Sequence, residues 1–284
     1  SWGSFEYRLR SNFDRILNLL NNSDNIATFF CLGWIARKYP EIIKEIHAAG
    51  HEIGTHSNAH QLVYRYDRKF FRNDLEISVK SLEDLTGEKI KAYRAPGFSL
   101  VASTLWVFEE LVNQGIEYDC SIFLGNHSHG GRIKTFGHNP SIIDIDGKTI
   151  KEFPVNSVRI IAKEVAFSGG GYFRFLPYPI IKQLMNRSKY IMAYFHPRDF
   201  DYEQPIIFDL SLFRKFKSYY GLKNSFAKAE KFVKDFDFVT LSHADKLINW
   251  SDADKFHLID ENFYKKVDLD SLTQSEMEQW NIGD

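Results

Sequence analysis

The stretch GHEIGTHSNAH, residues 50–60, carries His56 and His60, two histidines four residues apart at the end of a short strand-like run. The run from Ala49 to Thr55 is too short and too rich in glycine for a stable helix, so we expect a short strand that ends at His56 and a turn that carries His60. Imidazoles at this spacing can close onto one metal ion with open coordination positions, which is the catalytic kind of site. The alternative is that both histidines are ordinary polar loop residues, because such pairs also arise from composition alone.

Short apolar strands alternate with helical stretches on both sides of this run. Residues 26–32 are almost continuously apolar, which is typical of a parallel strand buried on both faces. Helices are expected at residues 9–20, 35–49, 67–85, 103–114, 178–186 and 225–236, and further strands at 91–94, 118–122, 151–154, 190–195 and 237–240. The alternation predicts a mostly parallel sheet that is closed or nearly closed on itself.

Some of the expected strands carry a charged or ionisable side chain in or beside the apolar run. Arg94 ends one strand, Asp119 lies in the next, and His196 follows the strand at residues 190–195. Catalytic groups of a β/α barrel come from the C-terminal ends of several strands. The layout therefore favours a barrel enzyme.

Composition favours one soluble domain without a nucleic-acid partner. The chain has 284 residues and no Pro/Gly/Ser-rich linker or repeat, and α/β barrels commonly use this length for one domain. A net charge of -1 with 26% charged residues provides no broad basic field. No apolar run approaches the roughly 20 residues that span a bilayer, and no signal segment begins at Ser1. Cys31 and Cys120 form no zinc or disulfide pattern, which favours a cytoplasmic location.

The chain resembles the polysaccharide deacetylase family (NodB-homology domain, carbohydrate esterase family 4), in particular the subgroup of bacterial exopolysaccharide and O-antigen gene clusters. The similarity runs from about Phe13 to about Ser242. Its most specific pieces are ATFF at 27–30, GHEI at 50–53 with the histidine pair, RAP at 94–96, GGGYFR at 169–174 and FHP at 195–197. The resemblance implies a distorted (β/α)7-type barrel in residues 1–250, to which we add an irregular, acidic tail at residues 251–284.

The resemblance also implies roles for individual residues. His56 and His60 match the histidine ligands of a divalent metal, with zinc the first expectation and cobalt or nickel as alternatives. His196 matches the catalytic acid that protonates the leaving amine, although it could instead be a core histidine. Arg94 matches the arginine that orients the catalytic carboxylate, and it could also form a structural ion pair with Asp119. Asp119 itself lies where the family has a weaker acidic motif.

Substrate contacts are expected from Gly97, Tyr172 and Arg174. Gly97 replaces the tyrosine whose backbone amide usually helps to bind the oxyanion, and a backbone donor needs no side chain. The glycine run at 169–171 lacks the lysine and hydroxyl residue of a phosphate loop. It is either a structural turn or a substrate-side loop, from which Tyr172 and Arg174 could contact sugar hydroxyls, carboxylates or a diphosphate carrier.

One family motif is missing from this sequence. Family members carry an aspartate pair on a first strand, one as catalytic base and one as third metal ligand, whereas this chain enters the first helix almost at once. Asp14 is expected inside that helix and Asp24 in the turn after it, so neither replaces the pair. We expect the strand and its aspartates upstream of Ser1, unless the protein is a degenerate homologue. If another carboxylate serves as base, Asp119 and Asp199 are the first candidates.

Together these features predict a metal-dependent hydrolase that removes acetyl groups from N-acetylated sugars during exopolysaccharide or lipopolysaccharide biosynthesis. The expected partner is an acetylated glycan or glycan precursor. An O-acetyl esterase or another amide hydrolase on the same scaffold is the nearest alternative. A non-catalytic sugar-binding homologue is the alternative from another class. The sequence does not determine the sugar, its linkage, the acetyl position, the metal or the oligomeric state.

Overall fold

The computed structural model describes residues 8–124, 133, 136–155, 157–160, 163–207 and 210–258. Within these residues, a seven-stranded sheet has the order β1-β2-β3-β4-β6-β5-β9. Its strands are β1 Thr28–Cys31, β2 Glu52–Thr55, β3 Ala92–Tyr93, β4 Tyr118–Asp119, β5 Ser141–Ile145, β6 Lys148–Glu152 and β9 Asp254–His257. The ladders from β1 through β4 to β6 are parallel, as the alternation of strands and helices predicts. In the described part of the chain, β1 and β9 remain the two ends of this order.

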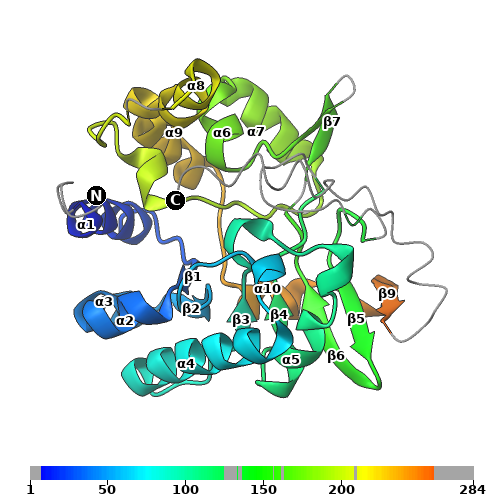
Figure 1. The fold of residues 1–284 in the computed structure, drawn as a ribbon. Helices are drawn as coiled ribbons and strands as arrows, with labels where there is room; N and C mark the ends of the chain where they lie inside the picture. Colours follow the sequence, from blue (N-terminus) through cyan, green and yellow to red (C-terminus); the bar gives the residue numbers. More distant parts are fainter. Residues whose placement is uncertain are drawn as a thin grey trace.

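Four helices line the lower side of the sheet in Figure 1: α2 Gly33–Lys38, α3 Pro40–Ala48, α4 Arg68–Thr86 and α5 Val107–Asn113. Helix α3 buries Ile42, Ile43 and Ile46, the residues whose spacing predicts an inward face. The prediction of a single helix at residues 35–49 is wrong in one respect: the segment forms two helices. Pro40 occupies the first position of the second helix, where its missing N–H costs nothing. Asp67 caps α4 by accepting a hydrogen bond from the Phe70 amide.

A hairpin of β5 and β6 extends the sheet beyond the strand expected at 151–154. The strands are joined by Asp146 and Gly147, both with positive φ (52° and 80°), which is the backbone that a two-residue hairpin turn requires. Strand β9 then pairs in parallel with β5. Residues 254–257 therefore belong to the sheet, and the expectation that everything after residue 250 is irregular is wrong for them.

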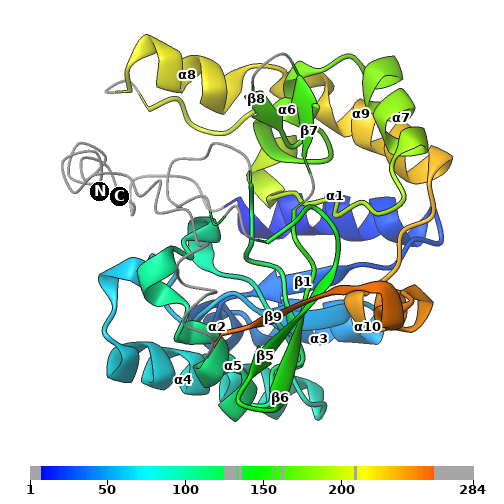
Figure 2. The ribbon, with the colours of Figure 1, turned by 90° about the vertical axis from the view of Figure 1, so that its right-hand side faces the viewer.

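A second layer lies above the sheet in Figures 1 and 2, with α1 between the two. It consists of α6 Gly170–Phe175, α7 Tyr178–Arg187, α8 Leu212–Tyr219, α9 Leu222–Asp235 and the hairpin of β7 Val158–Ile160 and β8 Lys163–Val165. Its apolar core contains Phe167, Phe173, Ile181, Met185 and Phe232. Helix α1 spans Leu9–Asn21, and α10 spans Leu241–Leu247. Short 3-10 helices are η2 Val63–Arg65, η3 Pro96–Phe98, η4 Ala102–Thr104, η5 Pro197–Phe200 and η6 Trp250–Asp252.

Two expected strands are irregular instead. In residues 190–195 only Tyr194 makes a bridge, with Gly169. Residues 237–240 follow α9 and form no strand. The Asn25 side chain binds this segment instead: it accepts a hydrogen bond from the Phe238 amide and donates one to the Val233 carbonyl. Side-chain hydrogen bonds of this kind compete with sheet formation. Among the described helices, none is long and apolar enough to cross a membrane.

Candidate active site

The two histidines of the opening motif meet at the C-terminal end of β2. His56 follows the strand directly, and its amide donates to the Cys31 carbonyl of β1. Ser57 and His60 both have positive φ (68° and 58°), so the chain reverses sharply between them. The Ser57 hydroxyl accepts a hydrogen bond from the His60 amide at 2.9 Å. The turn brings the His56 and His60 rings to a centroid distance of 5.0 Å, edge to face.

The His56 ring is fixed in the form that binds metals. Its Nδ1 lies 2.7 Å from the Arg94 carbonyl oxygen. A carbonyl can only accept, so Nδ1 carries the proton and Nε2 keeps its lone pair. Burial, followed by the charge of His60 and smaller effects of His196 and Arg94, lowers the pKa of His56 to about 3, although the hydrogen bond to Arg94 opposes the shift. The imidazole is therefore neutral at physiological pH, as a metal ligand must be.

Asp74 of α4 holds the histidine loop in place, and the sequence motifs did not reveal it. Its side chain is 4% exposed and accepts a hydrogen bond from the Asn58 amide at 2.8 Å. Burial raises its pKa, and hydrogen bonds from the loop, with the charge of Arg37, oppose this effect. Sequence could have revealed Asp74 because this carboxylate falls among the buried residues of helix α4. An acid without a partner is costly at such a position.

Arg94 lies at the end of β3 beside the histidines. Its amide donates to the Thr55 carbonyl, and its guanidinium lies 4.3 Å from the Phe30 ring centre. Nε donates to the Cys120 carbonyl at 3.3 Å. Among the residues that the structure describes, no carboxylate lies within ion-pair distance of this guanidinium, so the alternative of an Arg94–Asp119 ion pair is not realised there.

His196 enters the site from the second layer. Its side chain is 55% exposed, and its charge is close enough to contribute to the low pKa of His56. The Asp199 carboxylate accepts a hydrogen bond from the His196 amide at 2.9 Å and lies 3.6 Å from Nδ1 of the ring. Burial acts to raise the pKa of Asp199, but the hydrogen bonds and charge of His196, together with the charge of Arg174, outweigh it and lower the pKa. Asp199 therefore faces the ring as a carboxylate.

Arg174 is buried behind Asp199. It is 9% exposed, and its guanidinium donates to the carbonyls of Lys217, Ser218 and Tyr220 at the end of α8. Its Nε lies 3.4 Å from Asp199, an ion-pair distance without hydrogen-bond geometry. The substrate contact predicted for Arg174 stays a prediction, while these contacts give it a structural role.

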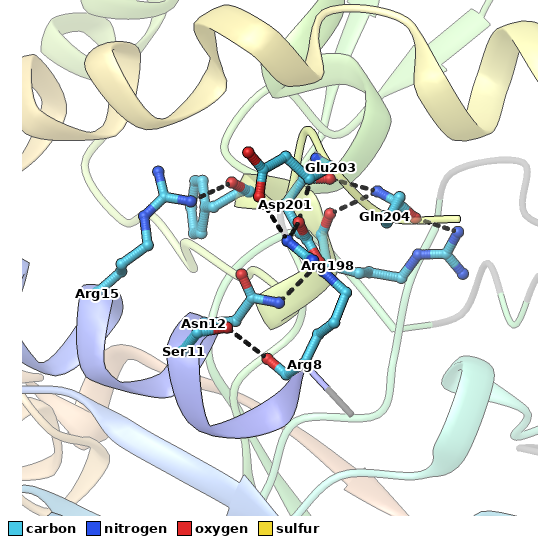
Figure 3. Close-up of polar contacts among 9 residues, drawn as sticks. Arg8, Ser11, Asn12, Arg15, Arg198, Asp201, Glu203 and Gln204 are labelled. Atoms are coloured by element: carbon cyan, nitrogen blue, oxygen red, sulfur yellow. Dashed lines mark hydrogen bonds and ion pairs between the residues drawn. The ribbon is translucent and has the colours of Figure 1, made fainter. Parts of the chain in front are cut away.

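The segment after His196 is held against α1 by charged and polar contacts (Figure 3). Arg8 donates to both carboxylate oxygens of Asp201 at 2.7 and 2.8 Å, and Asn12 donates to the same carboxylate at 2.9 Å. Arg15 donates to the Phe200 carbonyl. Burial acts to raise the pKa of Asp201, but the hydrogen bonds from Arg8 and Asn12, with the charge of Arg8, lower it. Helix α1 is thus joined to the segment that follows the candidate acid.

Asp119 and Glu152 form a buried carboxyl dyad at the ends of β4 and β6. They are direct partners in the parallel ladder, and both are 0% exposed. Asp119 accepts hydrogen bonds from the amide and hydroxyl of Ser121, and Glu152 accepts one from the Ile122 amide. Burial raises the pKa of Asp119, and burial with the Asp119 charge raises that of Glu152 well above its ordinary value. Glu152 Oε2 has no hydrogen-bond donor among the described residues, and two carboxyl groups in one buried site favour the retention of a proton. The catalytic role of Asp119 stays a prediction.

The glycine run is a site of close backbone contact. A Cβ atom added at Gly169 would lie 2.1 Å from the Tyr194 carbonyl oxygen, and Gly170 needs positive φ (54°). Residues 170–175 form α6, so the run is the start of a helix rather than a loop. Tyr172 lies near Tyr194, because its charge contributes to the raised pKa of Tyr194 after the larger effects of burial and the Asp199 charge.

Gly97 lies beyond Arg94 in η3, with positive φ (61°). Its amide donates to no other residue in the described part of the chain. The structure thus brings together His56, His60, Arg94 and His196, with Gly97 next to them in sequence. In the described ranges, no third histidine, cysteine or carboxylate joins the histidine pair in a metal-binding group. A hollow of about 770 Å³ lies at the other end of the strands, around Gly50, Ile90 and Tyr118.

Two parts of this chain match known protein families. Residues 2–116 match the family described as polysaccharide deacetylase, and residues 120–246 match a domain of unknown function (DUF3473). A peptidoglycan-N-acetylglucosamine deacetylase of Bacillus cereus is 33% identical over 97 residues, which cover 34% of this chain and 35% of the relative. A peptidoglycan deacetylase of Helicobacter pylori is 31% identical over 113 residues, with 38% and 36% covered. The chain spans about a third of the length of these relatives.

The fold itself is similar to that of a solved structure. A candidate polysaccharide deacetylase from Mycobacterium smegmatis superposes with a TM-score of 0.59 and 17% identity, covering 88% of this chain and 80% of that chain. This likeness concerns the fold alone, which is an α/β architecture with a mostly parallel sheet. The matched residues 2–116 include the histidine pair at the end of β2. Residues 2–116 of this chain are therefore similar to the polysaccharide deacetylase family.

Proposed function

We propose that this protein is a metal-dependent hydrolase that removes acetyl groups from N-acetylated sugars of a bacterial surface polysaccharide or its precursor. The observation that carries the proposal is the histidine pair, with ring centres 5.0 Å apart and Nδ1 of His56 bound to the Arg94 carbonyl. The deacetylase relatives of residues 2–116 support the reaction class. Acetylated glycans in exopolysaccharide or lipopolysaccharide biosynthesis are the proposed substrates.

His56 and His60 would hold the metal ion. The donor set fits a divalent ion of the zinc, cobalt or nickel type, because neutral imidazole suits these metals and the His56 tautomer leaves Nε2 free. When bound, the ion supplies a Lewis acid that polarises a carbonyl and activates water. The His56 tautomer is set by the hydrogen bond to the Arg94 carbonyl. Because His56 follows β2 and Arg94 follows β3, this bond depends on the pairing of the two strands.

His196 would transfer the proton to the leaving amine. Its exposed ring can reach a bound sugar, and Asp199 turns Nδ1 toward itself and leaves Nε2 for the substrate. Arg174, fixed by the end of α8, holds Asp199 from behind. Asp199 therefore acts as a positioning residue for the acid.

Other residues would bind and orient the acetamide. The Arg94 guanidinium, with Phe30 packed against its face, would orient a catalytic carboxylate, as the resemblance implies. The Gly97 amide can donate to the developing oxyanion. Tyr172, at the start of α6 and near Tyr194, can contact a sugar hydroxyl.

Metal uptake tests the histidine pair without an activity assay. The double variant His56→Ala/His60→Ala should lose stoichiometric zinc and cobalt binding in elemental analysis and titration. The control is His47→Ala, a half-exposed histidine on α3 that pairs with Glu88. Equal metal content in the double variant, the control and the wild type would refute the site.

Acetate release tests the reaction. The complete gene product, loaded with zinc, cobalt or nickel, should release acetate from at least one N-acetylated glycan in a panel that also includes O-acetylated glycans. Release from O-acetylated glycans alone would favour the esterase alternative. No release from any substrate by metal-loaded protein would refute the proposal and favour a binding protein.

Asp199→Asn tests the positioning of His196. Asparagine keeps an acceptor for the His196 amide but removes the charge, so kcat should fall by about 10- to 100-fold with little change in KM. Asp201→Asn, an equally buried neighbour that pairs with Arg8, is the control and should leave kcat within a few-fold. Equal loss of kcat in both variants would show that the segment as a whole, and not the charge of Asp199, matters.

A further inference from the structure

The peptide group between Arg94 and Ala95 is hydrogen-bonded on both sides. Its carbonyl oxygen lies 2.7 Å from Nδ1 of His56, which carries the proton of that bond. Its N–H, which belongs to Ala95, donates to the hydroxyl oxygen of Ser121 at 2.8 Å. The C=O and N–H of a planar trans peptide point in opposite directions. One peptide group therefore connects the ring of His56 to the side chain of Ser121.

The Ser121 hydroxyl continues this chain to a buried carboxylate. An amide can only donate, so the hydroxyl oxygen accepts from Ala95 and its own proton is left for another partner. That proton goes to Oδ1 of Asp119 at 2.6 Å. The donors thus follow one direction from the His56 ring to Asp119. We call this chain of His56, the Arg94–Ala95 peptide, Ser121 and Asp119 the Asp119 relay.

The hydrogen bonds of the dyad leave the negative charge on Asp119. Each of its carboxylate oxygens accepts from Ser121, Oδ1 from the hydroxyl and Oδ2 from the amide at 3.0 Å. Glu152 accepts one hydrogen bond, from the Ile122 amide. Hydrogen bonds to the charged form of an acid favour that form, so a proton held by the two carboxyl groups belongs on Glu152.

The inner part of the Asp119 relay is closed to water. Ala95 and Asp119 are 0% exposed, and Ser121 is 1% exposed. Hydrogen bonds are electrostatically stronger in such surroundings, and bonds that run in one direction polarise one another. The charge of Asp119 makes the Ser121 oxygen a better acceptor for the Ala95 N–H. The polarised peptide then places more negative charge on the Arg94 carbonyl oxygen, which binds the His56 proton more strongly.

Neighbouring residues fix the peptide in the middle of the relay. Pro96 favours extended backbone at the residue before it, and Ala95 has φ -67° and ψ 132°. The Arg94 amide donates to the Thr55 carbonyl, and its Nε donates to the Cys120 carbonyl. The peptide is therefore held by bonds to both neighbouring segments, and it cannot turn its carbonyl away from His56 without breaking them.

We propose that Ser121 and Asp119 are positioning residues that hold His56 as a metal ligand through the Asp119 relay. They strengthen the hydrogen bond at Nδ1, which keeps Nε2 free and makes it a stronger donor to a metal ion. Asp119 is fully buried, so it acts through the relay and not on the substrate. The consequence for the metal rests on the proposed function, whereas the hydrogen bond to His56 does not.

Nuclear magnetic resonance on the metal-free full chain, with 15N in the histidine rings, tests the relay directly. The wild type should show His56 protonated at Nδ1, with the signal assigned by its loss in His56→Ala/His60→Ala. Ser121→Ala ends the chain at the peptide, so the Nδ1 proton should move upfield and exchange faster with water. Ser121→Thr keeps the hydroxyl and should restore the signal. Asp119→Asn keeps an acceptor without the charge and should give an intermediate shift.

Zinc titration measures the consequence for the metal site. Ser121→Ala should weaken zinc binding by about threefold to tenfold, less than the loss of a direct partner of a ligand, because the relay acts through a peptide group. Ser99→Ala is the matched control. Ser99 is 0% exposed, and its hydroxyl accepts a hydrogen bond from the Val63 amide at 2.9 Å. This control loses a buried bond of the same kind outside the relay, so the His56 signal and the zinc affinity should stay unchanged.

The outcomes separate the relay from general destabilisation and from the proposed function. Unchanged His56 signals in folded Ser121→Ala, or equal changes in Ser121→Ala and Ser99→Ala, would overturn the relay. Circular dichroism checks the folding, and if Ser121→Ala does not fold, Asp119→Asn decides by the same signals. If the signals shift as expected but the wild type takes up no metal, the relay stands and the proposed function fails.

Discussion

The Glu152→Gln variant should change how the stability of this protein depends on pH. In the folded protein Glu152 and Asp119 are fully buried ladder partners, and burial and mutual repulsion raise the pKa of Glu152 well above its ordinary value of 4.5. The folded dyad therefore keeps a proton that the unfolded chain releases once the pH exceeds 4.5. Glutamine carries a permanent donor to Asp119 and has no such proton to lose.

The sign and size of this pH dependence follow from the difference in bound protons between the folded and unfolded states. Because the folded-state pKa is raised, the stabilisation is complete below the unfolded value and is lost as the pH rises toward the folded value. One proton difference lowers the free energy of unfolding by about 1.4 kcal/mol per pH unit. From about pH 5.5 to about pH 7.5, the wild type should therefore lose up to about 2.7 kcal/mol relative to Glu152→Gln.

Urea unfolding followed by circular dichroism at both pH values measures this difference. Glu110→Gln is the matched control, because Arg72 and Arg68 hold the pKa of the buried Glu110 below its ordinary value despite desolvation. Glu110 is ionised in both states over this range, so its variant should differ from the wild type by a constant amount. If Glu152→Gln also differs by a constant amount, the dyad holds no extra proton and the reasoning fails.

Two further predictions concern the second layer. Gly169→Ala should destabilise the protein by about 1–3 kcal/mol, because the new Cβ would lie 2.1 Å from the Tyr194 carbonyl oxygen, whereas Gly171→Ala, with 3.7 Å of clearance, should be neutral or stabilising in thermal unfolding. Equal effects of the two alanines would contradict the close contact. Asp201→Asn should cost about 1–3 kcal/mol at neutral pH, because it removes the carboxylate charge that pairs with Arg8. This difference should shrink in acid, because the low folded-state pKa of Asp201 contributes stability only above the unfolded value, and that stability is lost as the pH falls through the folded value. A difference that persists at acid pH would contradict the ion pair.

The layout of the sheet and the place of the histidine pair follow from local patterns. The apolar run at residues 26–32 predicts a buried parallel strand, and the glycine-rich run before His56 predicts a strand that ends in a turn. Both depend only on neighbouring residues. The charged side chains at strand ends predict a common edge, and the structure places His56 and Arg94 there within hydrogen-bond distance.

Other features needed contacts between distant segments. The expected single helix at 35–49 fails because Pro40 starts a new helix, and the expected strand at 190–195 fails because Tyr194 finds only one bridge partner, Gly169. The hairpin turn at residues 146–147 does have a local signal, an Asp-Gly pair, which favours positive φ at both positions. Strand β9 has no such signal, because its partner β5 lies more than one hundred residues earlier.

Local sequence patterns predict the alternation of strands and helices and the turn that joins His56 to His60, and residues 2–116 are similar to the polysaccharide deacetylase family. The contacts between ionisable groups, in contrast, depend on how distant segments pack together. Asp119 faces Glu152, Asp199 faces His196, and Arg174 supports α8 instead of lying open to solvent. The reason is physical: hydrophobic periodicity is a local property of the chain, whereas a ladder partner or a buried ion pair exists only once segments far apart in sequence have packed together.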